Sequence, residues 1–401
     1  MSGLQGKRIL LGVTGSIAAY KAAEWVRALV KEEAMVTVIL TEAAERFVTA
    51  LTFAALSGNP VYRDLFDDAP DRVMAHINLS REHDVIVVAP ATAQTMARLA
   101  AGMADNLLAS VILAATIPVL VCPAMNSAML AHAATQENIV RLRGFGYHLV
   151  EPASGSLACG ESGAGRLPDW DVGREALLSV FAPQDLNGRR VLITAGPTRE
   201  PIDPARYISN RSSGKMGYAL ARTARRRGAE VTLISGPVSL PAPPGVKLIR
   251  VTTAEEMAVL VAQQAGSAEV IVKSAAVADF RPAAYQEQKI KKRQAGLALE
   301  LVKNTDILME LGRKRRPGQL LVGFAAESGD HEAEGRRKLT EKNLDLIVVN
   351  DILGKQTGFD VETNQVTLID KADSLVLPLL SKEDTADRIW DKVVALLGAA
   401  T

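Results

Sequence analysis

Cysteine is scarce in this chain: of 401 residues, only Cys122 and Cys159 carry a thiol. Two thiols cannot supply the disulfide framework of a small secreted domain, nor the four ligands of a structural zinc site. Any thiol chemistry must therefore depend on one residue.

Long hydrophobic runs and an excess of charge are also missing. The longest apolar stretches, 85–90 and 111–123, have the length of a strand or are interrupted by proline, so no membrane span is expected. The first eight residues lead into a strand without the apolar core of a signal peptide, which makes a cytoplasmic location the default expectation. A net charge of +1 argues against broad nucleic-acid binding.

Strand-like and helix-like segments alternate along the chain, and this order is typical of parallel sheets covered by helices. The same order starts again near Arg189, and 48% hydrophobic residues are enough for two cores. The sequence therefore predicts two doubly wound, Rossmann-like α/β domains in tandem, at 1–186 and 187–401. The expected strands are 8–13, 36–40, 85–89, 117–122, 189–194, 230–234 and 269–273, and the expected helices include 17–32 and 218–227.

Glycine and hydroxyl residues follow the first strand, at 12–16. Glycine lets the backbone approach a phosphate, and Ser16 opens a helix whose first amides are free donors. A tight turn into a helix needs glycine anyway, so spacing alone leaves both interpretations open. The segment 90–95 adds hydroxyls at the carboxyl edge of the sheet, where open α/β folds bind ligands.

An amide and a thiol stand out farther along. The strand at 117–122 leads to Asn126, and a glycine-flanked loop at 155–160 carries Cys159. An amide can hold a carboxylate and a thiol can release a proton, which suggests chemistry on a small acid. The alternatives are that Asn126 ends its strand in a turn and that Cys159 is a packing residue.

The second half presents different chemistry. A glycine turn at 194–200 and a segment at 209–217, rich in hydroxyls and amides, precede a helix and resemble a phosphate pocket. The spacing is not that of a Walker P-loop. Asp279 follows a strand and suits a nucleotide with its magnesium ion, whereas the basic run 289–293 is on composition a solvated face.

The first half resembles the flavin-dependent cysteine decarboxylases, and the whole chain resembles the bifunctional phosphopantothenoylcysteine decarboxylase/phosphopantothenate–cysteine ligases of bacterial coenzyme A synthesis. Gly15-Ser16, the segments 90–95 and 123–129, and the Cys159 loop carry the resemblance. It implies an FMN site in the first half. The implied flavin-binding residues are Gly15, Ser16, Thr41, Pro90, Ala91, Thr92, Thr95 and Met125.

The resemblance also implies roles for the decarboxylase residues. Loss of CO2 from a cysteine amide leaves a carbanion that needs an electron sink. In the family, FMN oxidises the substrate thiol to a thioaldehyde, which accepts those electrons. Asn126 would then hold the substrate carboxylate, Cys159 would donate a proton as hydride returns, and His76 would act as general base. On spacing alone, His76 is an ordinary surface or core residue.

For the second half, the resemblance implies ligation of 4′-phosphopantothenate to cysteine, with CTP converting the carboxylate to an acyl-cytidylate. Lys289 would stabilise charge, Asn210 would anchor the pantothenate, and Asp279 would meet Mg2+. Lys338 and Lys342, one helical turn apart, would neutralise phosphate, or would be an ordinary surface pair. The implied nucleotide-binding residues are Ser274, Ala275, Ala276, Asp279, Lys289, Asn304, Thr305, Asp306, Ile307, Phe324, Lys338 and Lys342.

The partners implied by the resemblance are 4′-phosphopantothenate, L-cysteine and CTP, in a homo-oligomer that is a dodecamer of trimeric decarboxylase and dimeric ligase units. A second interpretation keeps only the flavin half active, or redirects it to a cysteine-ended peptide or to flavin prenylation. A third makes the chain a flavin-binding regulatory subunit. The joint presence of Asn126, Cys159 and Lys289 argues against the third, because a binder needs none of them.

Overall fold

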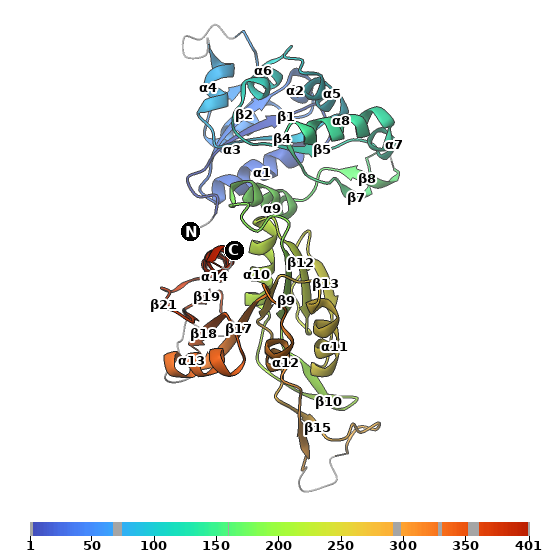
Figure 1. Ribbon diagram of the computed structural model, residues 1–401. Coiled ribbons are helices and arrows are strands. Elements are labelled where there is room, and N and C mark those ends of the chain that lie inside the picture. The colour runs from blue at the N-terminus through green and yellow to red at the C-terminus, as the bar shows by residue number, and fades with distance from the viewer. Residues whose placement is uncertain are drawn as a thin grey trace. The chain divides into compact units, whose positions relative to one another are not determined.

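The computed structural model describes residues 3–66, 74–158, 160–291, 298–327, 331–351 and 361–399. The chain divides into two compact units, Met1–Phe181 and Ala182–Thr401, and both have the predicted α/β architecture (Figure 1). The segment 182–186 packs with the second unit. There, Leu186 is fully buried, and Arg227 donates from Nε to Asp185 Oδ1 at 2.8 Å.

The first unit contains a sheet whose strands are all parallel in the described part of the chain, in the order β3-β2-β1-β4-β5-β6. β1 and β4 therefore lie side by side at the centre of the sheet. The strands that follow β1 are added toward one edge, and those that follow β4 are added toward the other. The strands are β1 (Arg8–Val13), β2 (Met35–Leu40), β3 (Val61–Tyr62), β4 (Val85–Ala91), β5 (Val119–Pro123) and β6 (His148–Leu149). The helices are α1 (Ala19–Lys31), α2 (Glu42–Glu45), α3 (Ala50–Ser57), α4 (Ala75–Arg81), α5 (Ala93–Ala101), α6 (Leu107–Ala114), α7 (Ser127–Ala131), α8 (Ala133–Gly144) and α9 (Trp170–Phe181).

Alternating side chains of this sheet enter two hydrophobic cores, one on each face. Ile9 and Leu11 lie in one core with Trp25 of α1, whereas Leu10 lies in the other with Leu108 of α6. Because both faces are covered, the strands read as continuous apolar runs, which is why the sequence identified them. β1 and β2 lie within one residue of the expected bounds.

The second unit repeats the strand order and then departs from it. The eight strands of its main sheet, among the described residues, run β13-β12-β9-β14-β17-β18-β20-β21; the first six are mutually parallel, and β18–β20 and β20–β21 pair antiparallel. The antiparallel edge is an addition to the parallel sheet that the sequence predicted. The strands are β9 (Arg190–Ala195), β12 (Glu230–Ser235), β13 (Lys247–Arg250), β14 (Val270–Lys273), β17 (Leu320–Glu327), β18 (Leu346–Asp351), β20 (Val366–Asp370) and β21 (Ser374–Val376). The helices are α10 (Lys215–Arg226), α11 (Ala254–Ala265), α12 (Ile307–Lys314), α13 (His331–Glu341) and α14 (Lys382–Ala399).

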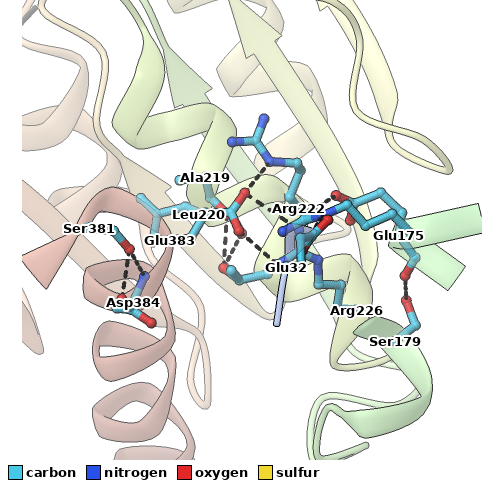
Figure 2. Close-up of polar contacts among 12 residues, drawn as sticks. Glu32, Glu175, Ser179, Ala219, Leu220, Arg222, Arg226, Ser381, Glu383 and Asp384 are labelled. Carbon is cyan, nitrogen blue, oxygen red and sulfur yellow. Dashed lines mark hydrogen bonds and ion pairs between the residues drawn. The ribbon is translucent and has the colours of Figure 1, made fainter. Parts of the chain in front are cut away.

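The last helix, α14, is fixed to α10 by both polar and apolar contacts. The Glu383 carboxylate accepts from Arg222 at 3.2 Å and from Arg226 at 3.1 Å, and Ser381 donates to Asp384 at the start of the helix (Figure 2). The fully buried Trp390 donates from its indole nitrogen to the Leu220 carbonyl at 3.1 Å. These contacts join the end of the chain to the core of the second unit.

Four short strand pairs in the described part of the chain supplement the two sheets. In the second unit, β10 and β15 lie side by side and form an arm beyond the main sheet (Figure 1). The pairs are β7 (Ala153–Ser156) with β8 (Ser162–Arg166), β10 (Arg199–Asp203) with β11 (Arg206–Ser209), β15 (Phe280–Pro282) with β16 (Leu301–Lys303), and β19 (Thr363–Asn364) with β22 (Leu380–Ser381). Across the described ranges, none of the helices has both the length and the apolar character needed to cross a bilayer.

Candidate functional site

A cavity of about 1530 Å3 opens at the carboxyl ends of β1, β2 and β4 in the first unit. This is the switch point at which open α/β sheets bind their ligands. Most of the predicted flavin-binding residues line it, namely Gly15, Ser16, Thr41, Thr92, Thr95 and Met125. Pro90 and Ala91 instead act through their carbonyls, which accept from Thr14 Oγ1 at 2.6 Å and from the Ala124 amide at 2.9 Å.

The turn after β1 is shaped by close backbone contacts. A Cβ on Gly15 would lie 2.5 Å from the Ala43 Cβ, so a larger residue would push the two loops apart. Next to it, the Ser16 amide donates to the Thr14 carbonyl at 2.8 Å. Thr92 caps α5 by accepting from the Thr95 amide at 3.3 Å. Glycine at 15 is thus required by packing as well as suited to a phosphate.

The chemistry of this cavity fits FMN. Hydroxyls at Ser16, Thr41 and Thr92 can bind a phosphate, and Leu107 and Met129 provide apolar wall for a ring system. Its size exceeds the roughly 300–1,000 Å3 of ordinary ligand pockets, enough for a flavin with part of a substrate.

Asn126 is oriented by the turn between β5 and α7. Its Oδ1 accepts from the Ala128 amide at 2.8 Å, which caps α7 and leaves Nδ2 directed outward. That Nδ2 donates to the Glu161 carboxylate at 2.9 Å. The predicted carboxylate-binding amide therefore holds a carboxylate of the chain itself. Sequence reasoning missed Glu161, and its spacing from Asn126 gave no signal.

The β7–β8 hairpin, which carries Glu161 near its tip, is seated tightly on this turn. The Met125 amide donates to the Gly165 carbonyl at 2.9 Å, and Ser127 Oγ donates to the Ala164 carbonyl at 2.8 Å. A Cβ on Gly165 would lie 2.1 Å from the Met125 carbonyl oxygen, so only glycine allows this approach. Residues 155 and 156 of the expected loop thus belong to β7, and the hairpin that β7 forms with β8 packs against the candidate site.

Three other residues of the first unit are relevant to the predicted decarboxylase site. Cys159, the predicted proton donor, lies outside the described residues. Cys122 is fully buried, and burial raises the pKa of its thiol, which disfavours the reactive thiolate. His76 lies on α4 and lines neither of the two cavities that contain Met125. Within a single chain, His76 therefore does not line the same cavity as Asn126.

In the second unit, backbone and side chains meet at the carboxyl ends of β9 and β14. Asn210 Nδ2 donates to the carbonyls of Ala276 and Val277, at 3.2 Å each. Ser274 Oγ donates to the Thr194 carbonyl at 2.7 Å, and the Ala275 amide donates back to Thr194 Oγ1 at 3.2 Å. These bonds hold the segment 274–279 next to the helix start expected to bind phosphate.

The predicted nucleotide-binding residues after β16 join the same edge. Asn304 donates from Nδ2 to the Ala278 carbonyl at 2.8 Å, and its amide donates to the Asp279 carbonyl at 2.8 Å. Asp306 caps α12 and accepts from Lys342 Nζ at 2.7 Å. Asn210, Asn304 and Lys342 are thus gathered around one segment by contacts that the sequence could not display.

Known protein families match both parts of the chain. Residues 2–175 match the Flavoprotein family, and residues 186–397 match the DNA/pantothenate metabolism flavoprotein C-terminal domain. The coenzyme A biosynthesis bifunctional protein CoaBC of Vibrio cholerae is 47% identical over 391 residues, which is 97% of this chain and 98% of that protein. The CoaBC proteins of Bacillus subtilis and Escherichia coli are each 46% identical over 98% of this chain, covering 98% and 97% of those proteins. This chain belongs to the CoaBC family.

Two solved structures each match part of this chain. A C-terminal domain of a CoaBC protein is 41% identical, covering 54% of this chain and 99% of that one, with a TM-score of 0.47. The FMN-dependent cysteine decarboxylase SpaF is 30% identical, covering 45% of this chain and 99% of that one, with a TM-score of 0.38.

Lys273 is a residue of this CoaBC chain that sequence reasoning passed over. It ends β14, directly before Ser274, and its Nζ donates to the Ala275 carbonyl at 2.9 Å. Burial lowers the pKa of Lys273 to about 8, Asp306 opposes this effect, and the charge of Lys342 adds to it. A lysine that is partly neutral near physiological pH therefore lies at the predicted nucleotide edge.

The remaining predicted ligase residues of this CoaBC chain are more scattered. Lys289 is exposed in the segment where the Ile290 amide donates to Asp203 of the β10–β11 hairpin, and among the described residues no hydrogen bond or ion pair joins it to Asn210 or Asn304. Asp279 is exposed, and no cluster of three or more acidic, histidine or cysteine residues occurs in the described ranges. A single carboxylate fits Mg2+ that arrives with the phosphates of a substrate, since this ion commonly keeps one or two protein carboxylates. Phe324 lies in β17 and Lys338 in α13.

Proposed function

We propose that the chain performs two consecutive steps of coenzyme A synthesis. The second unit joins 4′-phosphopantothenate to L-cysteine with CTP and Mg2+, and the first unit decarboxylates the product, with FMN, to 4′-phosphopantetheine. The observation that carries the proposal is family membership over nearly the full length, together with a cavity lined by six of the predicted flavin-binding residues.

In the first unit, FMN bound in the large cavity would supply the electron sink that decarboxylation needs. The chain's own residues bind and orient the substrate. Asn126 presents Nδ2 to a carboxylate, as its bond to Glu161 demonstrates for an internal one. The substrate carboxylate would take the place of the Glu161 carboxylate on this Nδ2. We propose that Cys159 donates the proton, and that the His76 of a neighbouring copy in the oligomer acts as the general base.

In the second unit, activation of a carboxylate is needed before an amine can attack it. Lys273 and Lys342 carry positive charge at the nucleotide edge, and Lys338 on α13 would add to it, so that the three offset the triphosphate. Lys342 is held by Asp306, so its position is set before the nucleotide binds. Lys289 lies on the arm and would stabilise charge on the reacting carboxylate and α-phosphate.

One experiment tests both halves of the proposal. The purified protein should be yellow, and with 4′-phosphopantothenate, cysteine, CTP and Mg2+ it should form a product lighter by CO2 than the ligated amide. Mass spectrometry of the products and the flavin absorbance spectrum provide the measurement. A colourless protein that binds no FMN would reject the first half, and absence of CTP-dependent amide would reject the second.

Nucleotide binding should be linked to proton uptake through Lys273. Its pKa of about 8 is below its usual value, so at pH 8 roughly half of the molecules are neutral there. A triphosphate beside it favours the charged form, and we expect uptake of up to about half a proton at pH 8. Calorimetry of Mg2+–CTP binding in two buffers of different ionisation enthalpy measures this number.

The Lys273→Met variant should take up fewer protons than the wild type, whereas Lys247→Met, which alters an exposed lysine on β13, should not differ. Stability gives a second measure. Because the folded pKa is the lower one, the contribution of Lys273 to stability is full above about pH 10.5 and is lost as the pH falls through 8. Equal proton uptake by the wild type and Lys273→Met would contradict the assignment.

A further inference from the structure

A second cavity, of about 510 Å3, adjoins Asn126 on the side of α1 and the hairpin. Its size falls within the roughly 300–1,000 Å3 of pockets that enclose a small molecule. Two cationic residues, Lys21 and Arg166, line it together with the hydroxyl residues Ser16 and Ser156. No acidic residue is among the described residues that line it. The cavity thus combines a carboxylate-binding amide with separate positive charge.

Arg166 is the cation available to a ligand. It is half-buried at the end of β8, where it pairs with Ala153, and its side chain makes no hydrogen bond or ion pair with the residues in the described ranges. Its backbone is fixed, because the preceding Gly165 accepts from the Met125 amide. Its guanidinium lies over Gly155, where a Cβ would be 2.7 Å from one of its nitrogens. A glycine at this point of β7 lets the side chain lie along the hairpin.

Lys21 is held in place behind Arg166. Its side chain is only 13% exposed, and its Nζ donates to the Leu167 carbonyl at 3.3 Å and to Asp169 at 2.9 Å. Asp169 is largely exposed. The hydrogen bond from Lys21 lowers the pKa of Asp169, with a smaller contribution from the charge of Arg166. Both cations therefore act on the same region, where Asp169 accepts from Lys21.

We propose that Arg166, supported by Lys21, is the subsite for the phosphate monoester of the decarboxylase substrate. This inference rests on the proposed function, because it assumes that Asn126 binds the carboxylate at the other end of the molecule. A guanidinium suits the site, since it can donate two parallel hydrogen bonds to a phosphate. The cavity then selects phosphorylated pantothenoylcysteine over an unphosphorylated one and over a peptide that ends in cysteine.

The test compares two substrates in the flavin-loaded, full-length protein. Decarboxylation of 4′-phosphopantothenoylcysteine and of its dephosphorylated analogue is measured for the wild type, Arg166→Gln and Arg166→Lys. A hydrogen-bonded charge contributes on the order of 10- to 100-fold in binding, so Arg166→Gln should raise KM for the phosphorylated substrate by that factor. Its KM for the analogue should change less than about threefold, and Arg166→Lys should recover part of the loss.

Arg143→Gln is the matched control, because it removes an exposed charge of the same unit that is paired with Glu151 on the surface. It should leave both substrates unaffected. An equal loss on both substrates would show that Arg166 only supports the hairpin, and loss of bound flavin would assign it to the cofactor; either result overturns the proposal. A wild-type protein that decarboxylates neither substrate would instead reject the proposed function.

Discussion

Replacing Asn126 with aspartate should lower kcat/KM for decarboxylation by at least about 100-fold, because a charged hydrogen bond is lost and a like charge takes its place. The substitution is nearly isosteric, and aspartate caps helices as well as asparagine does. The bond from Ala128 that fixes the turn would therefore persist. What changes is the atom that faces the substrate, because an amide nitrogen that donates a hydrogen bond is replaced by a carboxylate oxygen that can only accept one.

The loss should appear chiefly in KM, since holding the carboxylate contributes to binding before the reaction begins. Steady-state kinetics with 4′-phosphopantothenoylcysteine measure both constants. The same sample offers two internal controls: flavin content, because Met125 and Thr92 still line the cofactor cavity, and CTP-dependent ligation by the second unit. Decarboxylation within tenfold of the wild type would exclude Asn126 as the carboxylate-binding group.

The parts of the site that the sequence predicted are those encoded locally. The turn at 12–16 and the cap formed by Thr92 and Thr95 each depend on a few neighbouring residues, and the strands before them are apolar runs covered on both faces. Because parallel strands end at one edge, these segments had to meet there. Short-range pattern and one rule of topology thus indicated the segments 12–16 and 90–95, whereas the full flavin-binding set came from the family resemblance.

The parts that were missed depend on contacts across long separations in the chain. Asn126 and Glu161 are 35 positions apart, and their bond requires the β7–β8 hairpin, whose glycine-rich strands carry no hydrophobic alternation. The pKa of Lys273 is lowered by burial and by Lys342, which follows it by nearly seventy residues of the printed sequence. Burial and long-range electrostatics are properties of the folded chain, so no local sequence pattern could have predicted the environment of Glu161 or of Lys273.

Replacing Lys289 with alanine should reduce ligation by about 100- to 1000-fold and leave decarboxylation of supplied 4′-phosphopantothenoylcysteine unchanged. The size follows from the cost of removing one preorganised charge from a reaction that develops negative charge. The arm keeps its conformation in the variant, because its contacts are made by neighbours of Lys289. The Gln286 amide donates to the Ile202 carbonyl at 3.0 Å, and the Ile290 amide donates to Asp203 at 3.1 Å.

Lys289 itself is exposed and makes no side-chain hydrogen bond or ion pair among the described residues, so its replacement removes no contact that the described fold depends on. Lys247→Ala, which removes an exposed lysine from β13 of the same unit, is the matched control and should ligate normally. The two variants are compared by pyrophosphate release and by amide formation. If Lys289 acts on the activation step, both signals fall together; if only amide formation falls, its charge serves the attack of cysteine, and if neither falls, the assignment is wrong.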